Sequence, residues 1–257
     1  MAGPDGSTQN DPGFRLEVPE DSVGWFISSM PDPYPEEHVE EEVRAHAEIV
    51  SRRGSSLVHL EPCPGPDAGE EGVWLCVVTD DRPGLLSLLS AAIAAHSLDV
   101  LSAAVYTRSR PGLPDEAVDL FSVRRLGPVR DALDVSDLAP IKKTMIALLR
   151  GELPVERLER HAADTSRPSK RPETAIYFHS TEPDLLLVET QDHPGLLLDI
   201  TLTIFRERLS IIRSHITTIA GVARDEFQLA EIDGSELSEP RRMAIIEKVR
   251  DAVGKPR

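Results

Sequence analysis

Residues 73–101, with the sequence VWLCVVTDDRPGLLSLLSAAIAAHSLDVL, decide the fold of this 257-residue chain. The apolar run Val73–Val78 predicts a buried strand, and Leu86–Ile93 carries apolar residues at helical spacing. The loop between them, DRPG at residues 81–84, is therefore a strand-to-helix junction. Proline sets the backbone for a first helical turn, glycine allows close approach, and the first amides of a helix lack acceptors. The loop is thus a candidate site for an anionic group.

The same pattern occurs a second time, 111 residues further along the chain. A second apolar strand, Leu185–Thr190, is followed by the loop DHPG at residues 192–195 and by a second amphipathic helix. The apolar residues of the two helices keep the offset of 111, as do Thr79 and Thr190. The chain therefore contains an internal repeat, which predicts two units of the same architecture.

Further elements are expected around each strand-loop-helix motif. Alternating apolar residues predict second strands in which Leu101, Ala103 and Val105, like Ile212, Ser214 and Ile216, face the helices. A helix closes each unit, with the apolar stripes Leu138, Ile141, Met145, Leu148 and Met243, Ile246, Val249, Val253. The strands are expected at Ser56–Glu61, Asp99–Arg108 and Ala117–Arg124, and at Thr174–His179, Ser210–Ala220 and Val222–Glu231.

Each unit therefore has the order strand, strand, helix, strand, strand, helix. Moving the leading strand to the end gives βαββαβ, so the predicted fold class is α+β. It consists of two ferredoxin-like units, circularly permuted as ββαββα, with antiparallel sheets and helices on one face. The expected division is a disordered tail (1–21), an N-terminal helical segment (22–55), the first unit (56–152), an exposed linker (153–173) and the second unit (174–257).

Composition excludes several classes of partner. The net charge of −16 argues against nucleic acid and against an anionic membrane, because both require a basic face. Cys63 and Cys76 have no metal-ligand spacing and are expected to be free thiols in a reducing compartment. We expect no metal site, no cofactor and no membrane span, and a cytoplasmic location.

The two loops and their flanks resemble ACT domains, small ferredoxin-like modules that bind amino acids and related ligands and regulate enzymes or transcription. The matching residues are the strand ends TDDRPGL (79–85) and TQDHPGL (190–196), together with Asp119-x-Phe121 and Asp225-x-Phe227. The pattern is most similar to the tandem ACT pair at the C-terminus of PII-protein uridylyltransferases. The resemblance begins near Trp25. The nucleotidyltransferase and phosphohydrolase motifs of those enzymes are not found in this sequence, so a non-catalytic sensor is expected.

The resemblance implies an amino-acid site at each loop, completed by a neighbouring unit. Backbone amides would hold the carboxylate of the amino acid and an aspartate its ammonium. In the alternative interpretation, the aspartate only caps the helix that follows. The candidate ligand-binding residues are Asp81, Arg82, Pro83, Gly84 and Leu85, and Asp192, His193, Pro194, Gly195 and Leu196.

Two functions from different classes follow. The first is a regulatory sensor of an amino acid such as glutamine that controls a protein partner in nitrogen or amino-acid metabolism. The second is a dimerisation or interaction module of the ACT type that needs no ligand. Unpaired strand edges favour a homodimer in either case. The sequence shows no recognisable Ser-His-Asp, Cys-His, metal-ligand or phosphate-loop arrangement, so an enzyme is the third and least favoured interpretation.

Overall fold

The computed structural model describes residues 22–65, 72–127, 133–162 and 174–254. The expected tail and most of the expected linker lie outside this part of the chain. Both repeats fold with the predicted element order, and the predicted fold class is confirmed. The first unit contains β1 (Val58–Pro62), β2 (Val73–Asp80), α4 (Leu85–Ala95), β3 (Leu98–Arg108), β4 (Glu116–Arg125) and α5 (Val135–Leu149). The second contains β5 (Ala175–Phe178), β6 (Leu185–Gln191), α7 (Leu196–Arg206), β7 (Leu209–Ile219), β8 (Val222–Glu231) and α8 (Glu239–Gly254).

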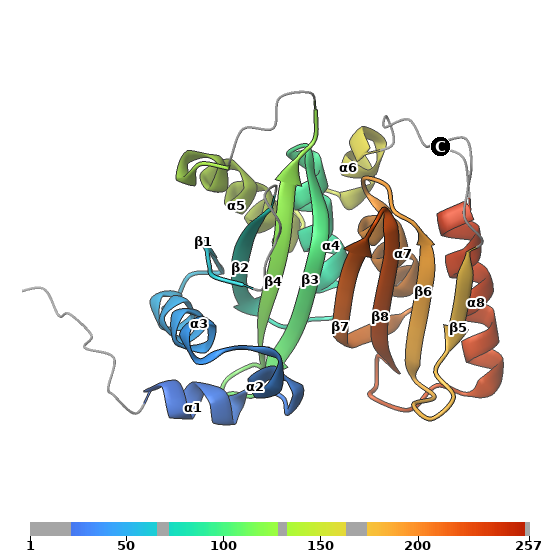
Figure 1. The fold of residues 1–257 in the computed structure, drawn as a ribbon, viewed down its shortest axis with the longest axis horizontal. Helices are drawn as coiled ribbons and strands as arrows, with labels where there is room; N and C mark the ends of the chain where they lie inside the picture. Colours follow the sequence, from blue (N-terminus) through green and yellow to red (C-terminus); the bar gives the residue numbers. More distant parts are fainter. Residues whose placement is uncertain (1–21, 66–71, 128–132, 163–173, 255–257) are drawn as a thin grey trace, which may run out of the picture.

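The two units share one antiparallel sheet because their central strands pair with each other. The strand order is β1-β2-β4-β3-β7-β8-β6-β5, and β3 and β7 lie side by side at its centre (Figure 1). The pairing runs from Ser102 opposite Thr217 to Val105 opposite Ser214. The Ser102 hydroxyl also donates a hydrogen bond to the Ile216 carbonyl at 2.8 Å. Each unit therefore covers one strand edge of the other.

Helices α4, α5, α7 and α8 pack on one face of this sheet (Figure 1). Helices α4 and α7 contact each other, so the apolar core runs without interruption from one unit to the next. Leu89 of α4 and Ile200 of α7 are fully buried in it. Each such side chain contributes about 1.5–3 kcal/mol through burial.

Three N-terminal helices cover the opposite face of the first unit's sheet: α1 (Ser22–Ser29), α2 (Pro33–Glu37) and α3 (Glu40–Arg52). Phe26 and Tyr34 pack there against Val78 and Leu120. This second layer explains why β2 is a continuous apolar run, since a strand covered on both faces has no polar side. In β6 the outward-facing Glu189 is partly exposed, and the strand alternates accordingly.

A β-bulge in each unit changes which side chains face the helices. Ladder pairing is interrupted at Leu101 in β3 and at Ile212 in β7. The prediction that Ile212 faces the helices is therefore wrong, and its side chain is 48% exposed. Ala103, Val105, Ser214 and Ile216 are buried as predicted.

Two predictions about helices are also corrected. In α8 the buried residues are Ile245, Val249 and Val253, whereas Met243 is 57% exposed. Of the predicted stripe, Ile246, Val249 and Val253 pack in or against the core. Only Met243 is misplaced, because packing of α8 against α7 buries Ile245 instead. Within the expected linker, residues 155–162 form the helix α6 (Val155–Ala162), whose Leu158 packs against the core.

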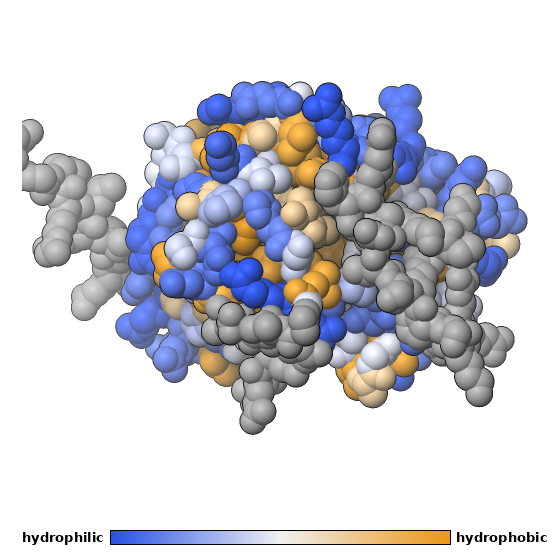
Figure 2. All heavy atoms as spheres, turned by 90° about the horizontal axis from the view of Figure 1, so that it is seen from above, coloured by the Kyte–Doolittle hydropathy of each residue, from blue (hydrophilic) through white to orange (hydrophobic). Residues whose placement is uncertain are grey.

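No helix among the described residues has both the length and the apolar composition needed to cross a membrane. Figure 2 looks onto the end of the molecule that carries α5 and α6 in Figure 1. Hydrophobic side chains reach the surface there between hydrophilic ones.

His46 of α3 is fully buried. Its Nδ1 lies 2.7 Å from the Tyr34 hydroxyl, and its Nε2 lies 3.3 Å from the Pro64 carbonyl. Because a carbonyl only accepts hydrogen bonds, Nε2 carries the proton and Nδ1 accepts from the tyrosine. Burial, followed by the charge of His38, lowers the pKa of His46 to about 4.

We predict that His46 makes the free energy of unfolding depend on pH. The unfolded chain binds this proton at a higher pH than the folded chain. The stability is therefore complete above about pH 6.5 and falls as the pH is lowered toward 4, by roughly 3 kcal/mol. Urea denaturation across this range measures the loss. A His46→Gln variant cannot titrate and should show a shallower dependence, whereas an unchanged slope would contradict the assignment.

Candidate ligand site between the two units

The first loop joins β2 to α4 through a glycine with a left-handed backbone. Gly84 has a φ of 79°, and α4 begins at the next residue. The carboxylate of Asp81 accepts a hydrogen bond from the Thr107 hydroxyl at 2.9 Å, and no side chain caps the helix. The interpretation of Asp81 as a simple helix cap is therefore wrong.

The start of α4 presents backbone amides beside this carboxylate. The Leu85 amide, a candidate donor in the sequence, is occupied by the Arg82 carbonyl at 3.1 Å. Leu86 and Ser87 follow in the first turn, where amides have no acceptor within the helix. These amides and the positive end of the helix dipole favour an anion.

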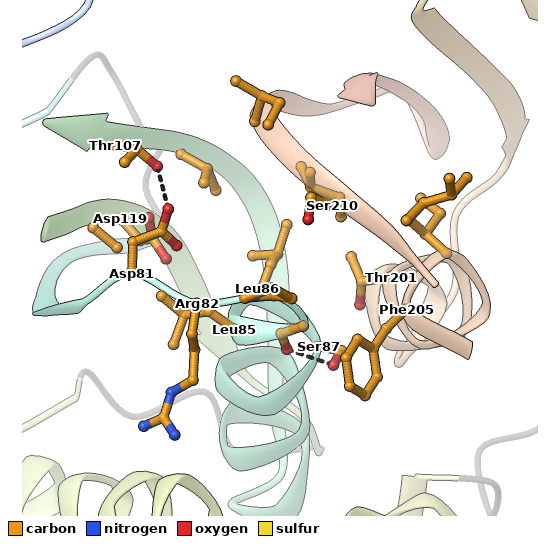
Figure 3. Close-up of a pocket in the computed structure, with 18 of the residues that line it drawn as sticks. Asp81, Arg82, Leu85, Leu86, Ser87, Thr107, Asp119, Thr201, Phe205 and Ser210 are labelled. Atoms are coloured by element: carbon orange, nitrogen blue, oxygen red, sulfur yellow. Dashed lines mark hydrogen bonds between the residues drawn. The ribbon is translucent and has the colours of Figure 1, made fainter. Parts of the chain in front are cut away.

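Arg82 lines the same cavity as this loop, but its guanidinium is bound to the end of α5. Its Nη1 donates to the Leu149 carbonyl at 2.9 Å, at the C-terminal end of α5. Figure 3 shows the guanidinium pointing away from the other labelled side chains. A cation suits a helix C-terminus, so the guanidinium of Arg82 stabilises α5.

The second unit supplies the opposite wall, so that the loop borders a cavity of about 280 Å³. Thr201 and Phe205 reach it from α7 and Ser210 from β7 (Figure 3). Phe205 lies so close that a Cβ added to Gly84 would come within 2.5 Å of its ring. Glycine is therefore required at this position both by its backbone and by the approach of the second unit. Apolar parts of the wall come from Val105, Ile204, Leu209 and Ile211.

Asp119 of β4 is a polar residue of this cavity that was not among the candidate site residues. Its side chain is fully buried, and neither carboxylate oxygen has a hydrogen-bond partner of ordinary geometry among the described residues. Burial, and after it the charge of Asp81, raises its pKa well above the usual value. Asp119-x-Phe121 was visible as a motif in the sequence, but its place beneath the loop depends on strand pairing.

The second loop has the same backbone but almost no space beside it. Gly195 has a φ of 81° and precedes α7, and no side chain caps that helix. The cavity next to Asp192 and His193 measures only about 20 Å³. Burial, followed by the charge of Asp99, raises the pKa of Asp192 to about 6. The Nδ1 of His193 lies 3.1 Å from the Pro194 carbonyl.

Three substitutions between the repeats accompany this difference in volume. The repeat offset places Leu198 where the first site has Ser87, and Asp99 where it has Ser210. Asp99 lines the cavity beside the second loop and accepts a hydrogen bond from Arg124 at 2.8 Å. The third substitution puts Ala94 where the first site has Phe205.

A buried ion cluster lies on the other side of the first loop. Arg53, at the end of α3, donates to Asp80 at 2.8 Å and also pairs with Glu116. Arg108 and Arg110 pair with the same Glu116 at 2.7 and 3.0 Å. Burial opposes ionisation of Asp80, but hydrogen bonds from these arginines hold its pKa below the usual value. The cluster ties the N-terminal helices to the residue that precedes Asp81.

Among the described residues, no group of three or more His, Cys, Asp or Glu side chains could hold a metal ion. Cys63 and Cys76 are free, as expected. The chemistry that the first cavity offers is recognition: amides for an anionic group, carboxylates for a cationic one, and an apolar wall.

The fold and this cavity define a tandem pair of ferredoxin-like units with a ligand-sized space between them. No protein-family model matches the chain. Among curated proteins, it is similar to the bifunctional uridylyltransferase/uridylyl-removing enzyme of Phenylobacterium zucineum, with 30% identity over 84% of this chain and 23% of that enzyme. The enzymes of the same name from Rhodospirillum rubrum and Gluconobacter oxydans are each 27% identical, over 80% and 90% of this chain.

The chain is thus related to the bifunctional uridylyltransferase/uridylyl-removing enzymes, which confirms the resemblance drawn from the loop motifs. It spans about a quarter of the length of these relatives. Among solved structures, an unknown protein of Galdieria sulphuraria matches 72% of the chain and is itself covered to 94%, with 17% identity and a TM-score of 0.22. That score is too low to carry an argument about the fold.

We predict that Gly84→Ala destabilises the protein by about 2 kcal/mol or more, since it combines an unfavourable backbone with displacement of Phe205. Gly112 has a similar φ of 73° with open space around it, so Gly112→Ala incurs the backbone term alone. The difference between the two free energies of unfolding, measured by urea denaturation, gives the contribution of the contact with Phe205. Equal destabilisation would show that Phe205 does not press on the loop.

We also predict that the buried Arg53 contributes far more to the free energy of unfolding than its neighbour Arg52. Arg53→Ala removes a buried arginine that bonds to the buried Glu116 and to the half-exposed Asp80, and should lower the free energy of unfolding by about 2 kcal/mol or more. Arg52→Ala removes an exposed ion pair with Glu61 and should cost less than about 1 kcal/mol. Chemical denaturation measures both values. Similar losses would contradict the importance of the cluster.

Proposed function

We propose that this chain is a non-catalytic regulatory module of the ACT type that binds an amino acid between its two units. The observation that supports this best is the 280 Å³ cavity, in which the start of α4 from one unit faces α7 and β7 of the other. An amino acid carries a carboxylate and an ammonium on adjacent atoms. The Leu86 and Ser87 amides would receive the former, and Asp81 the latter.

The side chain of the bound amino acid is expected to be neutral. The cavity contains carboxylates, hydroxyl groups and apolar side chains, and the guanidinium of Arg82 is directed to α5. Among the described lining residues, a second carboxylate on the ligand would therefore meet other carboxylates and one guanidinium that is already engaged with Leu149. Glutamine fits this requirement, whereas glutamate does not. A keto acid lacks the ammonium group that Asp81 would receive.

We propose further that the two loops have different roles. The first, Asp81–Leu85, borders the larger space and is the working site. The second, Asp192–Leu196, borders a small space lined by Leu198 and Asp99, and would serve as an interface between the units. For the second loop, the interpretation as an interaction module without a ligand is therefore the better one.

The partner is proposed from the relatives. These are named as enzymes that add and remove uridylyl groups, and this chain matches about a quarter of their length. We therefore propose that glutamine, bound in the cavity, regulates such an activity in nitrogen metabolism. This role agrees with both the cavity and the similarity to these enzymes. Binding would favour one packing of the two units over another, which requires different affinities for the two arrangements.

We predict that isothermal titration with L-glutamine gives saturable heat with one site per chain, and that L-glutamate gives none. Ser87→Leu places in the first site the residue that already fills the second, and should weaken binding at least about tenfold by occupying the cavity. The matched exchange in the second unit, Leu198→Ser, should leave glutamine binding unchanged.

Each exchange introduces the side chain that the fold already accommodates at the equivalent position of the other unit. Circular dichroism checks that both variants are folded. Absence of heat with all twenty amino acids in folded protein would contradict the sensor proposal. Binding that is lost in Leu198→Ser and kept in Ser87→Leu would move the site to the second loop.

A further inference from the structure

Asp119 occupies a position where folding alone would favour an apolar residue. Its partners on the neighbouring strands are Val77 and Val105, and its side chain is fully buried. Neither oxygen has a hydrogen-bond partner of ordinary geometry among the described residues, where the backbone of Tyr106 offers only a weak contact, although buried polar groups are normally paired. Figure 3 shows Asp119 next to Asp81, at the wall of the cavity.

The charged groups around Asp119 are few and mostly negative. Asp81 faces it from the loop after β2, and Asp115 lines the same cavity from the turn before β4. Arg82 is engaged with the end of α5. Two carboxylates in such a setting do not both ionise easily, so burial and the charge of Asp81 raise the pKa of Asp119 and favour its neutral form.

We infer that Asp119 and Asp81 together form the receptor for the ammonium group of the ligand, and that binding releases one proton from this pair. The inference rests on the proposed function and extends it. When the ammonium arrives with its three protons, the Asp119 carboxyl loses its own proton to the solvent. The cation then lies between two carboxylates, and the oxygens that have no partner of ordinary geometry without the ligand acquire one.

The chain contains its own control for this idea. Asp225 of the second unit is the repeat equivalent of Asp119, lies between Val188 and Ile216, and is buried to the same degree. Its Oδ1 also has no partner among the described residues. It borders the small second cavity, where no amino acid fits. A purely structural role would apply to both residues, whereas a role in binding applies to Asp119 alone.

The first measurement is titration of the full chain with L-glutamine near neutral pH in two buffers of different ionisation enthalpy, phosphate and Tris. We expect the observed heats to differ by the amount that corresponds to about one proton released per bound amino acid. Below the pKa of Asp119 the association constant should rise about tenfold for each unit of pH. Glutaramate, which has the same carboxylate and amide but no ammonium, should not bind.

The second measurement compares Asp119→Asn with Asp225→Asn. Neither variant should melt at a much lower temperature than the unmodified protein without ligand, because a neutral amide of nearly the same volume replaces a neutral buried acid. Asp119→Asn should weaken glutamine binding at least about tenfold and abolish the difference between the two buffers. Asp225→Asn should leave binding and proton release unchanged.

Failure of this inference is separable from failure of the proposed function. Saturable heat that is equal in the two buffers, or that survives in Asp119→Asn, contradicts the inference and leaves the sensor proposal standing. A much lower melting temperature for both variants shows a structural role and also contradicts it. No heat with glutamine contradicts the sensor proposal for this amino acid, and the inference falls with it.

Discussion

The pairing of β3 with β7 is the contact on which the rest of the molecule depends. It joins two four-stranded sheets into one, and it brings α4 and α7 into contact on the same face. As a result, each helix start faces a helix and a strand of the other unit. The space beside Asp81 is bounded by Phe205 and Ser210, which come from across this junction. The site is thus a property of the pair.

The two repeats have diverged in sequence, so the junction leaves cavities of different volume beside the two loops. The backbone at Gly84 and Gly195 is the same within a few degrees, and both loops keep aspartate and proline. The side chains opposite them differ in size and charge, and these differences separate a space of about 280 Å³ from one of about 20 Å³. Duplication provides two scaffolds of this kind, and the residues that face the loops decide which of them can hold a ligand.

The first loop is also the place where the N-terminal helices meet the sheet. Asp80 belongs to the buried ion cluster around Arg53 and Glu116, whereas Asp81, the next residue, faces the cavity. The second unit has Gln191 and Val222 where the first has Asp80 and Glu116, so it has no such cluster. The larger cavity and the N-terminal layer therefore occur together on the first unit, joined through two consecutive residues.

Local pattern was sufficient for the elements and their order, because an apolar period of two or near four reports strand or helix directly, and the offset of 111 residues shows the repeat. The sequence by itself thus determined the permuted ferredoxin-like units and the two loops as junctions. It did not determine that Ile212 turns outward at a bulge, that Asp81 bonds to Thr107 rather than capping α4, or that Asp119 lies beneath the loop. Those features depend on strand register and on side-chain volume across the junction between the units, and contacts between distant residues leave no periodic trace in one sequence.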